Sequence, residues 1–405
     1  MTAVRHIDHG TGKATSTLPG RPDNRQGSGV DVGKEGGRFL NVKIREASFE
    51  DYSQIASLES KYFPETLSQE QWKHLWANNP VYNLLKDWPI GWVLENDEKR
   101  IVGHIGNIPL SYELHGNRLL VSTSRTWVVD QPYRSYSILL LEHYFSQNQV
   151  DLFIHPTVNA DALGAYNMFG ASRVPVGTWD ESAFWITGYQ GFTQSWLALN
   201  AFPLARALSY PLSVGLFCKD KLLGSSLRGN RDAVALELSK SFDDRFDAFW
   251  EALRKKNSHV LLGVRTREMM DWHFRYPLLH SKAWILTASN PSGLSAYSIF
   301  YRQDNPRFGL RRVRLVDFQA LDGNTALLVP MLSWALEKCR NDGIDMLESF
   351  GFRTDKQTVI NKIAPYERKL PSWQYFYKTR DKSLAERLSD PSVWDPSQFD
   401  GDASL

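Results

Sequence analysis

The segment IHPTVNADALGAYNMFGASRV, residues 154–174, decides how this part of the chain folds. Its apolar start is typical of the end of a buried strand. Asn159 can cap the helix that follows, and Gly170 can end it in the left-handed conformation that glycine tolerates. Tyr166 lies about two helical turns after Asn159, so both side chains lie on the same side of one short helix. From spacing alone, a capping asparagine and a core tyrosine are the favoured interpretation.

A second informative segment is VVDQPYRSYSILLLEHY, residues 128–144. It predicts a strand that ends at Asp130, a turn rich in serine and tyrosine, and a helix that buries Ile138 and later apolar residues. A helix that starts directly after a strand points backbone N–H groups outward, and its dipole favours anions there. The segment could therefore hold a pyrophosphate, although many strand-to-helix turns share this arrangement.

Together the two segments resemble the GCN5-related N-acetyltransferase (GNAT) family. The family's helix reads Asn-x-x-Ala-x-x-x-Tyr-x-x-x-Gly, and Asn159, Ala162, Tyr166 and Gly170 occupy those places in order. In the family, the asparagine contacts coenzyme A and the tyrosine often protonates the departing thiolate. The resemblance implies the same roles for Asn159 and Tyr166.

The family's pyrophosphate loop, Gln/Arg-x-x-Gly-x-Gly/Ala, corresponds here to Arg134-x-x-Ser137-x-Leu139, so both small positions differ. The resemblance implies acetyl-CoA or another acyl-CoA as co-substrate. The expected cofactor-binding residues are Val129, Arg134, Ser135, Tyr136, Ser137, Ile138, Leu139 and Asn159.

Acyl transfer to an amine also needs a base, because the attacking amine must be neutral. The sequence offers Glu113, Asp130 and His155. His155 ends a buried strand beside the expected thioester cleft, which makes it a catalytic candidate next to Tyr166, but a lone histidine there is more often structural. The base is left unassigned.

The order of strands and helices, with a hairpin that turns at residues 115–117, predicts an α/β fold of the α+β type, with a mixed sheet. The order recurs more faintly in the second half. We therefore expect two tandem GNAT-like domains, the second one degenerate and without a recognisable pyrophosphate loop. The expected division is a disordered tail (1–40), an acyl-CoA-binding domain (41–187), a helical linker (188–234), the degenerate domain (235–380) and a C-terminal tail (381–405).

Composition limits the partners. The 405 residues, at about 150 per domain, favour two domains and an extra segment. The 47 Lys and Arg nearly balance the 45 Asp and Glu, which disfavours nucleic acid as a partner. Two cysteines and unpaired histidines predict neither disulfides nor a metal site. Pro203, Arg206 and Pro211 interrupt the longest apolar stretch, 196–218, so we expect amphipathic helices rather than a membrane span, with membrane-surface contact as a minority alternative.

These observations favour a cytoplasmic acyl-CoA-dependent N-acyltransferase. Its acceptor would be a small-molecule or glycan amine, such as an amino sugar or a surface-polysaccharide precursor. Two alternatives stay open. One is a Fem-like aminoacyl transferase, which would need a tRNA-binding surface that this near-neutral chain does not show. The other is a catalytically inactive GNAT-fold scaffold, favoured by Ser137 and Leu139.

Overall fold

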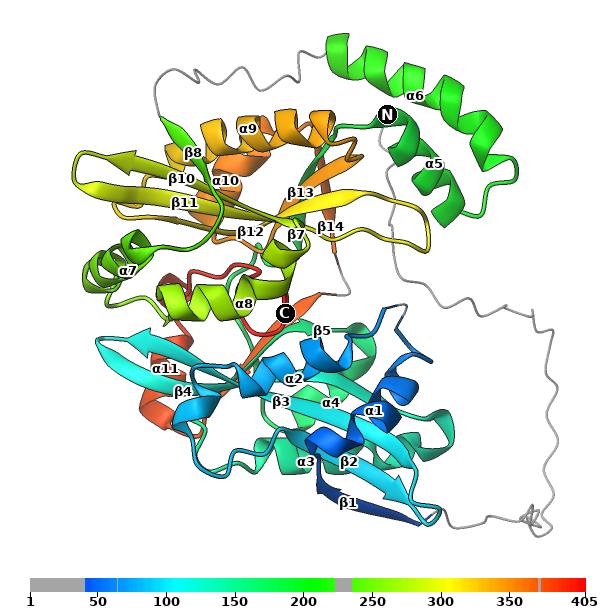
Figure 1. The fold of residues 1–405 in the computed structure, drawn as a ribbon, viewed down its shortest axis with the longest axis vertical. Helices are drawn as coiled ribbons and strands as arrows, with labels where there is room; N and C mark the ends of the chain where they lie inside the picture. Colours follow the sequence, from blue (N-terminus) through cyan, green and yellow to red (C-terminus); the bar gives the residue numbers. More distant parts are fainter. Residues whose placement is uncertain (1–40, 64, 223–234, 371–372) are drawn as a thin grey trace, which may run out of the picture.

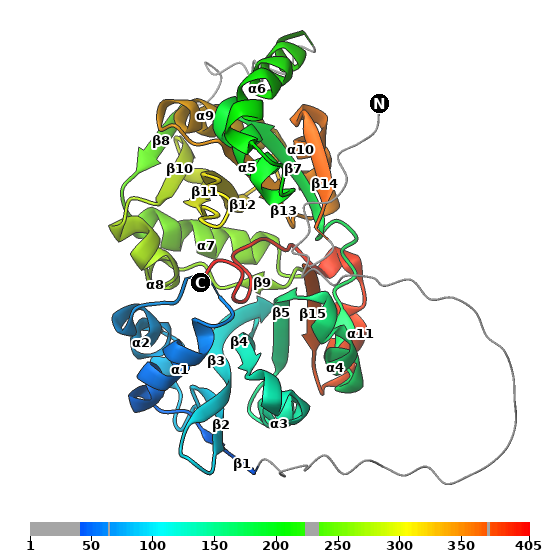
Figure 2. The same cartoon turned by 90° about the vertical axis from the view of Figure 1, so that its right-hand side faces the viewer.

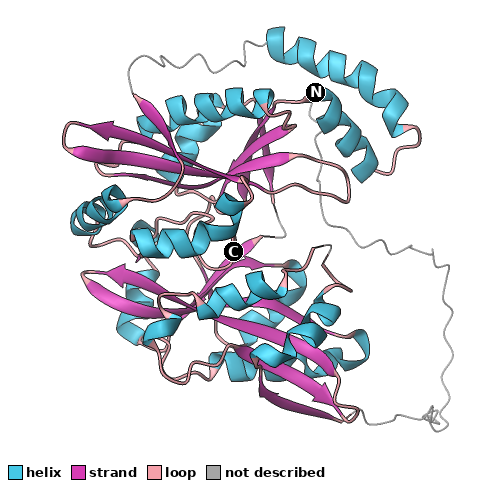
Figure 3. Cartoon of the chain, in the orientation of Figure 1, coloured by secondary structure: helices cyan, strands magenta, loops and turns pink. Residues whose placement is uncertain are grey.

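The computed structural model describes residues 41–63, 65–222, 235–370 and 373–405, so the tail predicted for residues 1–40 lies outside the described residues. The chain builds two units stacked on one another, each with a mixed sheet covered by helices (Figure 1, Figure 3). This is the α/β fold with two similar units that the element order predicted. In the described ranges, no helix combines the length and the apolar character needed to span a bilayer.

The first sheet has one parallel pair, β4 with β5, and is otherwise antiparallel. Its strands in spatial order are β1 (Val42–Glu46), β2 (Gly91–Asn96), β3 (Ile101–Leu114), β4 (Asn117–Val129), β5 (Leu152–Val158), β15 (Gln374–Lys378) and β6 (Ser172–Arg173), and β9 (Leu262–Gly263) also pairs with β3. Helices α1 (Tyr52–Glu59) and α2 (Gln69–Ala77) lie on one face, and α3 (Ser137–Phe145) and α4 (Leu163–Met168) lie on the other (Figure 2).

The second sheet repeats this plan, with β12 and β13 as its parallel pair. Its strands in spatial order are β8 (Leu236–Ser239), β10 (Ala283–Asn290), β11 (Gly293–Arg302), β12 (Arg312–Ala320), β13 (Met346–Phe350), β7 (Glu181–Ile186) and β14 (Tyr366–Lys369). Its main helices are α7 (Asp244–Lys256), α8 (Arg267–Leu279), α9 (Leu328–Asn341) and α10 (Thr354–Ile363).

Strands from each half of the sequence join the sheet of the other unit. β7 precedes the helical linker in the sequence but pairs with β13 and β14 of the second sheet. β15 comes near the end of the chain but pairs with β5 and β6 of the first sheet. The short strand β9 likewise lies in the second half of the sequence but pairs with β3 of the first sheet. The expected boundaries 41–187 and 235–380 are therefore crossed by three strands, because an apolar strand pattern does not specify which sheet the strand will join.

The hairpin turn between β3 and β4 lies where the sequence predicts it. We predicted a turn at residues 115–117, and His115 and Gly116 have φ values of 52° and 76° between β3 and β4. Positive φ at both central residues is what a two-residue type I′ turn requires, and it matches the twist of the flanking strands. The turn fixes the register in which β3 holds β4, the strand that leads to the candidate site.

The predicted helical linker contains α5 (Tyr189–Leu199) and α6 (Ala205–Leu222). The predicted C-terminal tail needs correction, because its residues 393–405 are all buried or half-buried. Helix α11 (Lys382–Leu388) packs beside the first unit, and the chain then runs between the two units (Figure 2). The side chains of Trp394 and Phe399 are only 2% and 6% exposed, so apolar burial orders this segment.

Candidate functional site

Strands β4 and β5 diverge in the middle of the first sheet. They pair only from Val121–Thr123 to Leu152–Ile154, although β4 continues to Val129 and β5 to Val158. Residues 125–127 of β4 are half-buried, whereas the four residues before them are fully buried. We call this opening the β4–β5 gap. It leaves an edge of β4 without a strand partner in the centre of a sheet, where backbone groups are normally paired.

A strained residue marks the gap. Thr126 has a φ of 51°, which is unusual for a β-branched side chain. At this point the pairing with β3 shifts, since Val128 lies opposite His104 but Arg125 lies opposite Gly106. Such a bulge turns the strand locally, and strain of this kind is concentrated at functional sites.

Ser124, His155 and Tyr166 form a buried cluster on one side of the gap. Ser124 Oγ lies 2.9 Å from His155 Nδ1 and 3.3 Å from the Tyr166 hydroxyl, which is 3.4 Å from the same nitrogen. Burial lowers the pKa of His155 to about 3 and raises the pKa of Tyr166. Both side chains are therefore neutral near pH 7. A histidine with this pKa is a poor base, which favours a positioning role for His155.

The helix that carries Tyr166 is built as expected. The Asn159 side-chain oxygen accepts a hydrogen bond from the Ala162 N–H at 3.0 Å, and Gly170 follows the helix with a φ of 73°. The N-cap and the glycine terminator are thus confirmed. Because the Asn159 oxygen is used by the cap, its amide nitrogen is the group that could contact a ligand.

The expected phosphate-binding segment has a different conformation from the one predicted. A 3₁₀ helix (Gln131–Tyr136) follows β4 directly and runs into α3. The Ser137 N–H, which we expected to point outward, donates to the Arg134 carbonyl. Arg134 and Ser135 are exposed. The four residues that follow are half-buried, namely Tyr136, Ser137, Ile138 and Leu139. Val129 is buried at the end of β4. The segment borders the gap, but its helical turn already uses that N–H group.

Two of the three candidate bases have other partners. Glu113 pairs with Arg254 at 2.9 Å. It lies seven positions along β3 from Gly106, the residue opposite Arg125 at the gap, and seven strand residues span roughly 24 Å. Asp130 accepts hydrogen bonds from Lys61 at 2.8 Å and from the Tyr62 hydroxyl at 3.2 Å. These ion pairs leave neither carboxylate directed at the cluster of Ser124, His155 and Tyr166.

The carboxylate of Asp402 lies at the gap and was not among the candidates predicted from the sequence. The Thr157 hydroxyl donates to Asp402 Oδ1 at 3.1 Å, so Asp402 lies against β5 beyond the point where it leaves β4. Burial raises the pKa of Asp402 to about 6, and the nearby Arg125 opposes this rise. A carboxyl group with such a pKa changes its charge near neutral pH, as general bases do. Asp402 belongs to no local sequence motif that would predict this role.

Neighbouring atoms show how closely the C-terminal segment approaches the gap. Gly401 has a φ of 58°, and a Cβ there would lie 2.6 Å from Pro156 Cδ and 3.0 Å from Thr123 Oγ1. Only glycine permits this approach. Thr123 Oγ1 is buried and has no hydrogen-bond partner among the described residues. The gap therefore contains an unsatisfied hydroxyl next to Asp402.

A second buried acid lies on the β3 side of the gap. Glu59 Oε1, at the end of α1, is 3.4 Å from His104 Nδ1. Burial alone would raise the pKa of Glu59, but the interaction with His104 and the Thr126 hydroxyl outweighs it, so the pKa lies below its usual value. The pair supports the strained Thr126. Nowhere in the described ranges do three or more His, Cys, Asp or Glu side chains gather as a metal-ligand group.

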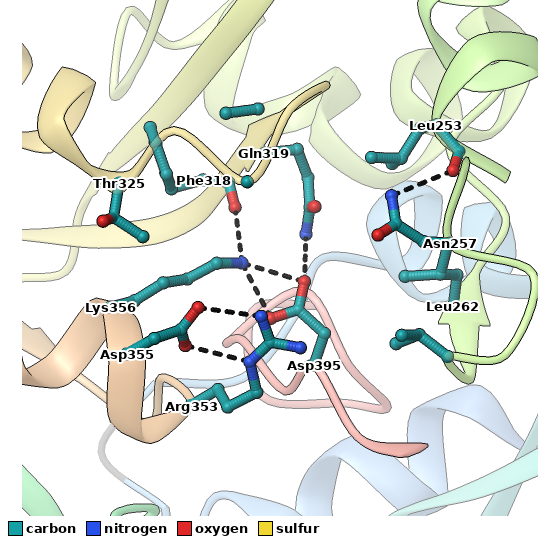
Figure 4. Close-up of a pocket in the computed structure, with 13 residues that line it drawn as sticks. Leu253, Asn257, Leu262, Phe318, Gln319, Thr325, Arg353, Asp355, Lys356 and Asp395 are labelled. Carbon is teal, nitrogen blue, oxygen red and sulfur yellow. Dashed lines mark hydrogen bonds and ion pairs between the residues drawn. The ribbon is translucent and has the colours of Figure 1, made fainter. Parts of the chain in front are cut away.

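The second unit has a corresponding opening that its own side chains fill. β12 and β13 pair as far as Leu315 and Ser349, and a cavity of about 30 Å³ lies beyond that point. Figure 4 shows Lys356 reaching across it: its Nζ lies 2.8 Å from both carboxylate oxygens of Asp395 and 3.1 Å from the Phe318 carbonyl. The remaining space holds a water molecule or two, not a coenzyme.

Comparisons with known proteins give structural matches only. No protein-family model and no curated protein sequence matches the chain. Saccharomyces cerevisiae N-myristoyltransferase with bound myristoyl-CoA is similar with a TM-score of 0.53 at 11% identity, over 86% of this chain and 80% of that chain. A GCN5-related N-acetyltransferase from Anabaena variabilis gives 0.52 at 12% identity, over 84% and 73%.

A GCN5-related N-acetyltransferase from Kribbella flavida gives a TM-score of 0.52 at 9% identity, over 84% of this chain and 71% of that chain. These matches cover most of both units. The chain thus has the GNAT fold in tandem, as the resemblance of residues 159–170 predicted. At these identities the matches establish the fold and leave the activity to the residues of the site.

Proposed function

We propose that this protein transfers an acyl group from a coenzyme A thioester to an amine. The observation that carries the proposal is the β4–β5 gap, where residues 125–127 of β4 are half-buried, Tyr166 contacts Ser124 of β4, and Asp402 contacts Thr157 of β5. The N-myristoyltransferase structure with bound myristoyl-CoA supports an acyl-CoA ligand for this fold. Acyl transfer needs a thioester site, a base and a donor for the leaving thiolate, and residues at the gap are candidates for the last two.

The first unit would bind the acyl-CoA. Its β4 edge beyond Thr123 lacks a strand partner in β5, so backbone N–H groups there can face the acyl oxygen. Arg134 and Ser135 are exposed beside the gap and would face the phosphates. The Lys356–Asp395 ion pair fills the corresponding place in the second unit. We therefore expect one acyl-CoA per chain, in keeping with a degenerate second unit.

The acid and base roles follow from the contacts that Tyr166 and Asp402 make with the two strands. Asp402 would accept the proton of the attacking amine, since its pKa of about 6 keeps it ionised at pH 7 to 8. Tyr166 would donate a hydrogen bond to the departing thiolate, because its raised pKa opposes complete proton transfer. Ser124 and His155 would orient the Tyr166 hydroxyl.

Binding and turnover test the proposal separately. Calorimetric titration with acetyl-CoA and with myristoyl-CoA would show whether the chain binds an acyl-CoA and which chain length it prefers. Thiol release from the bound acyl-CoA, measured with glucosamine and other primary amines, would report transfer. Absence of binding to both thioesters would contradict the proposal. The amino-sugar acceptor stays a prediction until such a panel is measured.

One observation favours the inactive-scaffold alternative. The segment around Arg134 and Ser137 is a closed helical turn, and Leu139 takes the place of a small residue. If this turn does not open, the phosphates have fewer N–H donors. Binding of acyl-CoA without transfer to any amine would support that alternative.

Ser137→Glu is expected to weaken acyl-CoA binding at least about tenfold, or about 1.4 kcal/mol, because it adds a negative charge beside the expected pyrophosphate. Ser146→Glu is the matched control, since Ser146 is exposed at the other end of α3. Titration of both variants with acetyl-CoA measures the difference. Equal affinities in the two variants would place the phosphates elsewhere.

Tyr166→Phe is expected to lower turnover by about 10-fold to 100-fold and to leave acyl-CoA affinity nearly unchanged, because it removes one hydrogen bond to the thiolate. Tyr144→Phe is a close control. Tyr144 is also buried and accepts a hydrogen bond from Ser122 at 2.7 Å, two positions before Ser124 on β4. If both variants lose stability and keep the same turnover, Tyr166 is only a core residue.

A further inference from the structure

Helix α6 is oriented with its polar side toward the protein. Its buried or half-buried residues are Ala205, Ser209, Ser213, Leu216 and Asp220, which recur at spacings of four, four, three and four and define one narrow stripe. Three of these five residues are polar. The usual pattern for a helix on a protein surface is the reverse, with apolar residues in the buried stripe.

The buried stripe anchors the helix at a few points. The Tyr189 and Tyr366 hydroxyls donate to the two oxygens of Asp220 at 2.9 and 2.6 Å. Leu216 contacts a small apolar cluster around Phe184. The rest of α6 extends beyond the second unit together with α5 (Figure 1, Figure 2). The described part of the protein therefore leaves most of the circumference of α6 uncovered.

The uncovered surface is apolar. Of the fourteen large hydrophobic side chains that are exposed in the described chain, eight lie between residues 202 and 222. Their exposure ranges from 43% for Leu208 to 78% for Leu204 and 87% for Leu222. Tyr210, at 66%, adds an aromatic ring. An apolar concentration of this kind marks a contact surface.

The exposed charges on the helical hairpin formed by α5 and α6 have one sign. Within residues 189–222 the exposed charged side chains are Arg206, Lys219 and Lys221. The one acidic residue of the hairpin, Asp220, is buried against the two tyrosines. The surface thus combines apolar side chains with positive charge, which complements an anionic lipid layer.

We propose that α6 docks on the surface of an anionic lipid bilayer. The apolar residues around Leu208 enter the boundary between headgroups and acyl chains, and the basic side chains reach the lipid phosphates and carboxylates. With 18 residues, α6 is about 27 Å long and lies in the plane of the interface. The proposal is independent of acyl transfer, since it uses no residue of the β4–β5 gap.

Vesicle co-sedimentation with the full chain tests the docking. Vesicles of phosphatidylcholine with about 30% phosphatidylserine are expected to bind the protein at least tenfold more tightly than vesicles of phosphatidylcholine alone, because each basic side chain near the surface contributes about fivefold. Raising the salt concentration to about 0.5 M should remove most of this preference. Failure to bind the phosphatidylserine vesicles would overturn the proposal.

Three double variants identify the surface. Leu208→Ser combined with Val214→Ser is expected to reduce binding to phosphatidylserine vesicles at least tenfold. Leu84→Ser combined with Leu279→Ser removes leucines elsewhere that are even more exposed, and is expected to change nothing. Arg206→Gln with Lys221→Gln should lower binding to phosphatidylserine vesicles more than tenfold and leave binding to phosphatidylcholine unchanged.

Self-association is the competing explanation for the same surface. Light scattering of the unmodified chain should give a monomer mass at the concentrations used with vesicles. A dimer that Leu208→Ser with Val214→Ser converts to monomers would overturn lipid docking in favour of a contact between copies. Unchanged vesicle binding in that variant would overturn it as well.

Discussion

Arg265→Met is expected to lower the free energy of unfolding by about 3 to 5 kcal/mol, because it leaves a buried carboxylate without its charge partner. Arg265 donates to both oxygens of Asp317, at 2.9 and 3.2 Å, and the two side chains are 1% and 0% exposed. Arg265 also donates to the Gly263 carbonyl at 2.8 Å. Denaturant unfolding of the variant measures the loss.

The location of this pair makes the loss global. Arg265 follows β9, which belongs to the first sheet, whereas Asp317 lies in β12 of the second. The Ser397 hydroxyl of the C-terminal segment donates to Asp317 at 2.8 Å, and the Phe399 ring lies 4.6 Å from the guanidinium carbon. One ion pair thus connects both sheets and the segment between them, so its loss should loosen all three.

Arg267→Met provides the matched control. Arg267 pairs with Asp244, but these side chains are 47% and 91% exposed, so the expected loss is far smaller than for Arg265→Met. Replacing Arg265 and Asp317 together by Met and Leu should restore part of the stability, because no charge then stays buried. A single Arg265→Met variant as stable as the control would show that water reaches Asp317.

The fold was predictable where the sequence is locally periodic. The turn at His115, the cap at Asn159 and the end of the helix at Gly170 each depend on a few adjacent residues, and all three are confirmed. The exchange of β7 and β15 was not predictable. Both strands are apolar and pair antiparallel with a neighbour, so their patterns fit either sheet, and the choice depends on the whole tertiary structure.

The candidate site divides in the same way. Tyr166 and His155 lie in one local segment that resembles a family motif, and the structure brings them within 3.4 Å of each other. Asp402 reaches the gap from the far end of the chain, and sequence reasoning had placed it in a tail. Its raised pKa comes from burial between the units, a property that no spacing in the sequence encodes.

Asp402→Asn is expected to lower turnover by about 100-fold to 1,000-fold, since general-base catalysis typically contributes this much. Asparagine keeps the shape and can still accept the Thr157 hydrogen bond, so acyl-CoA affinity should be unchanged. In the unmodified protein, turnover should fall as the pH drops through about 6, because protonation removes the base. Thiol release measured from pH 5 to 9 gives both results.

The stability of the Asp402→Asn variant separates a catalytic from a structural role. The folded pKa of about 6 lies above the unfolded value near 3.9, so folding disfavours the ionised form, and the stability that Asp402 contributes is lost as the pH rises through 6. At pH 8 the asparagine variant should therefore be at least as stable as the unmodified protein. At higher pH more of the amine is neutral, and a base is then needed less. The turnover deficit of the Asp402→Asn variant should therefore shrink toward pH 9.

Asp400→Asn is the control for this experiment. Burial raises the pKa of Asp400 to about 6 as well, but its carboxylate accepts a hydrogen bond from Tyr112 at 2.8 Å instead of contacting the gap. Asp400→Asn should therefore preserve turnover and its pH profile. If both variants reduce turnover equally, the effect comes from the packing of the C-terminal segment. If neither does, Asp402 is not the base, and Glu59, on the other side of Thr126, becomes the carboxylate to replace.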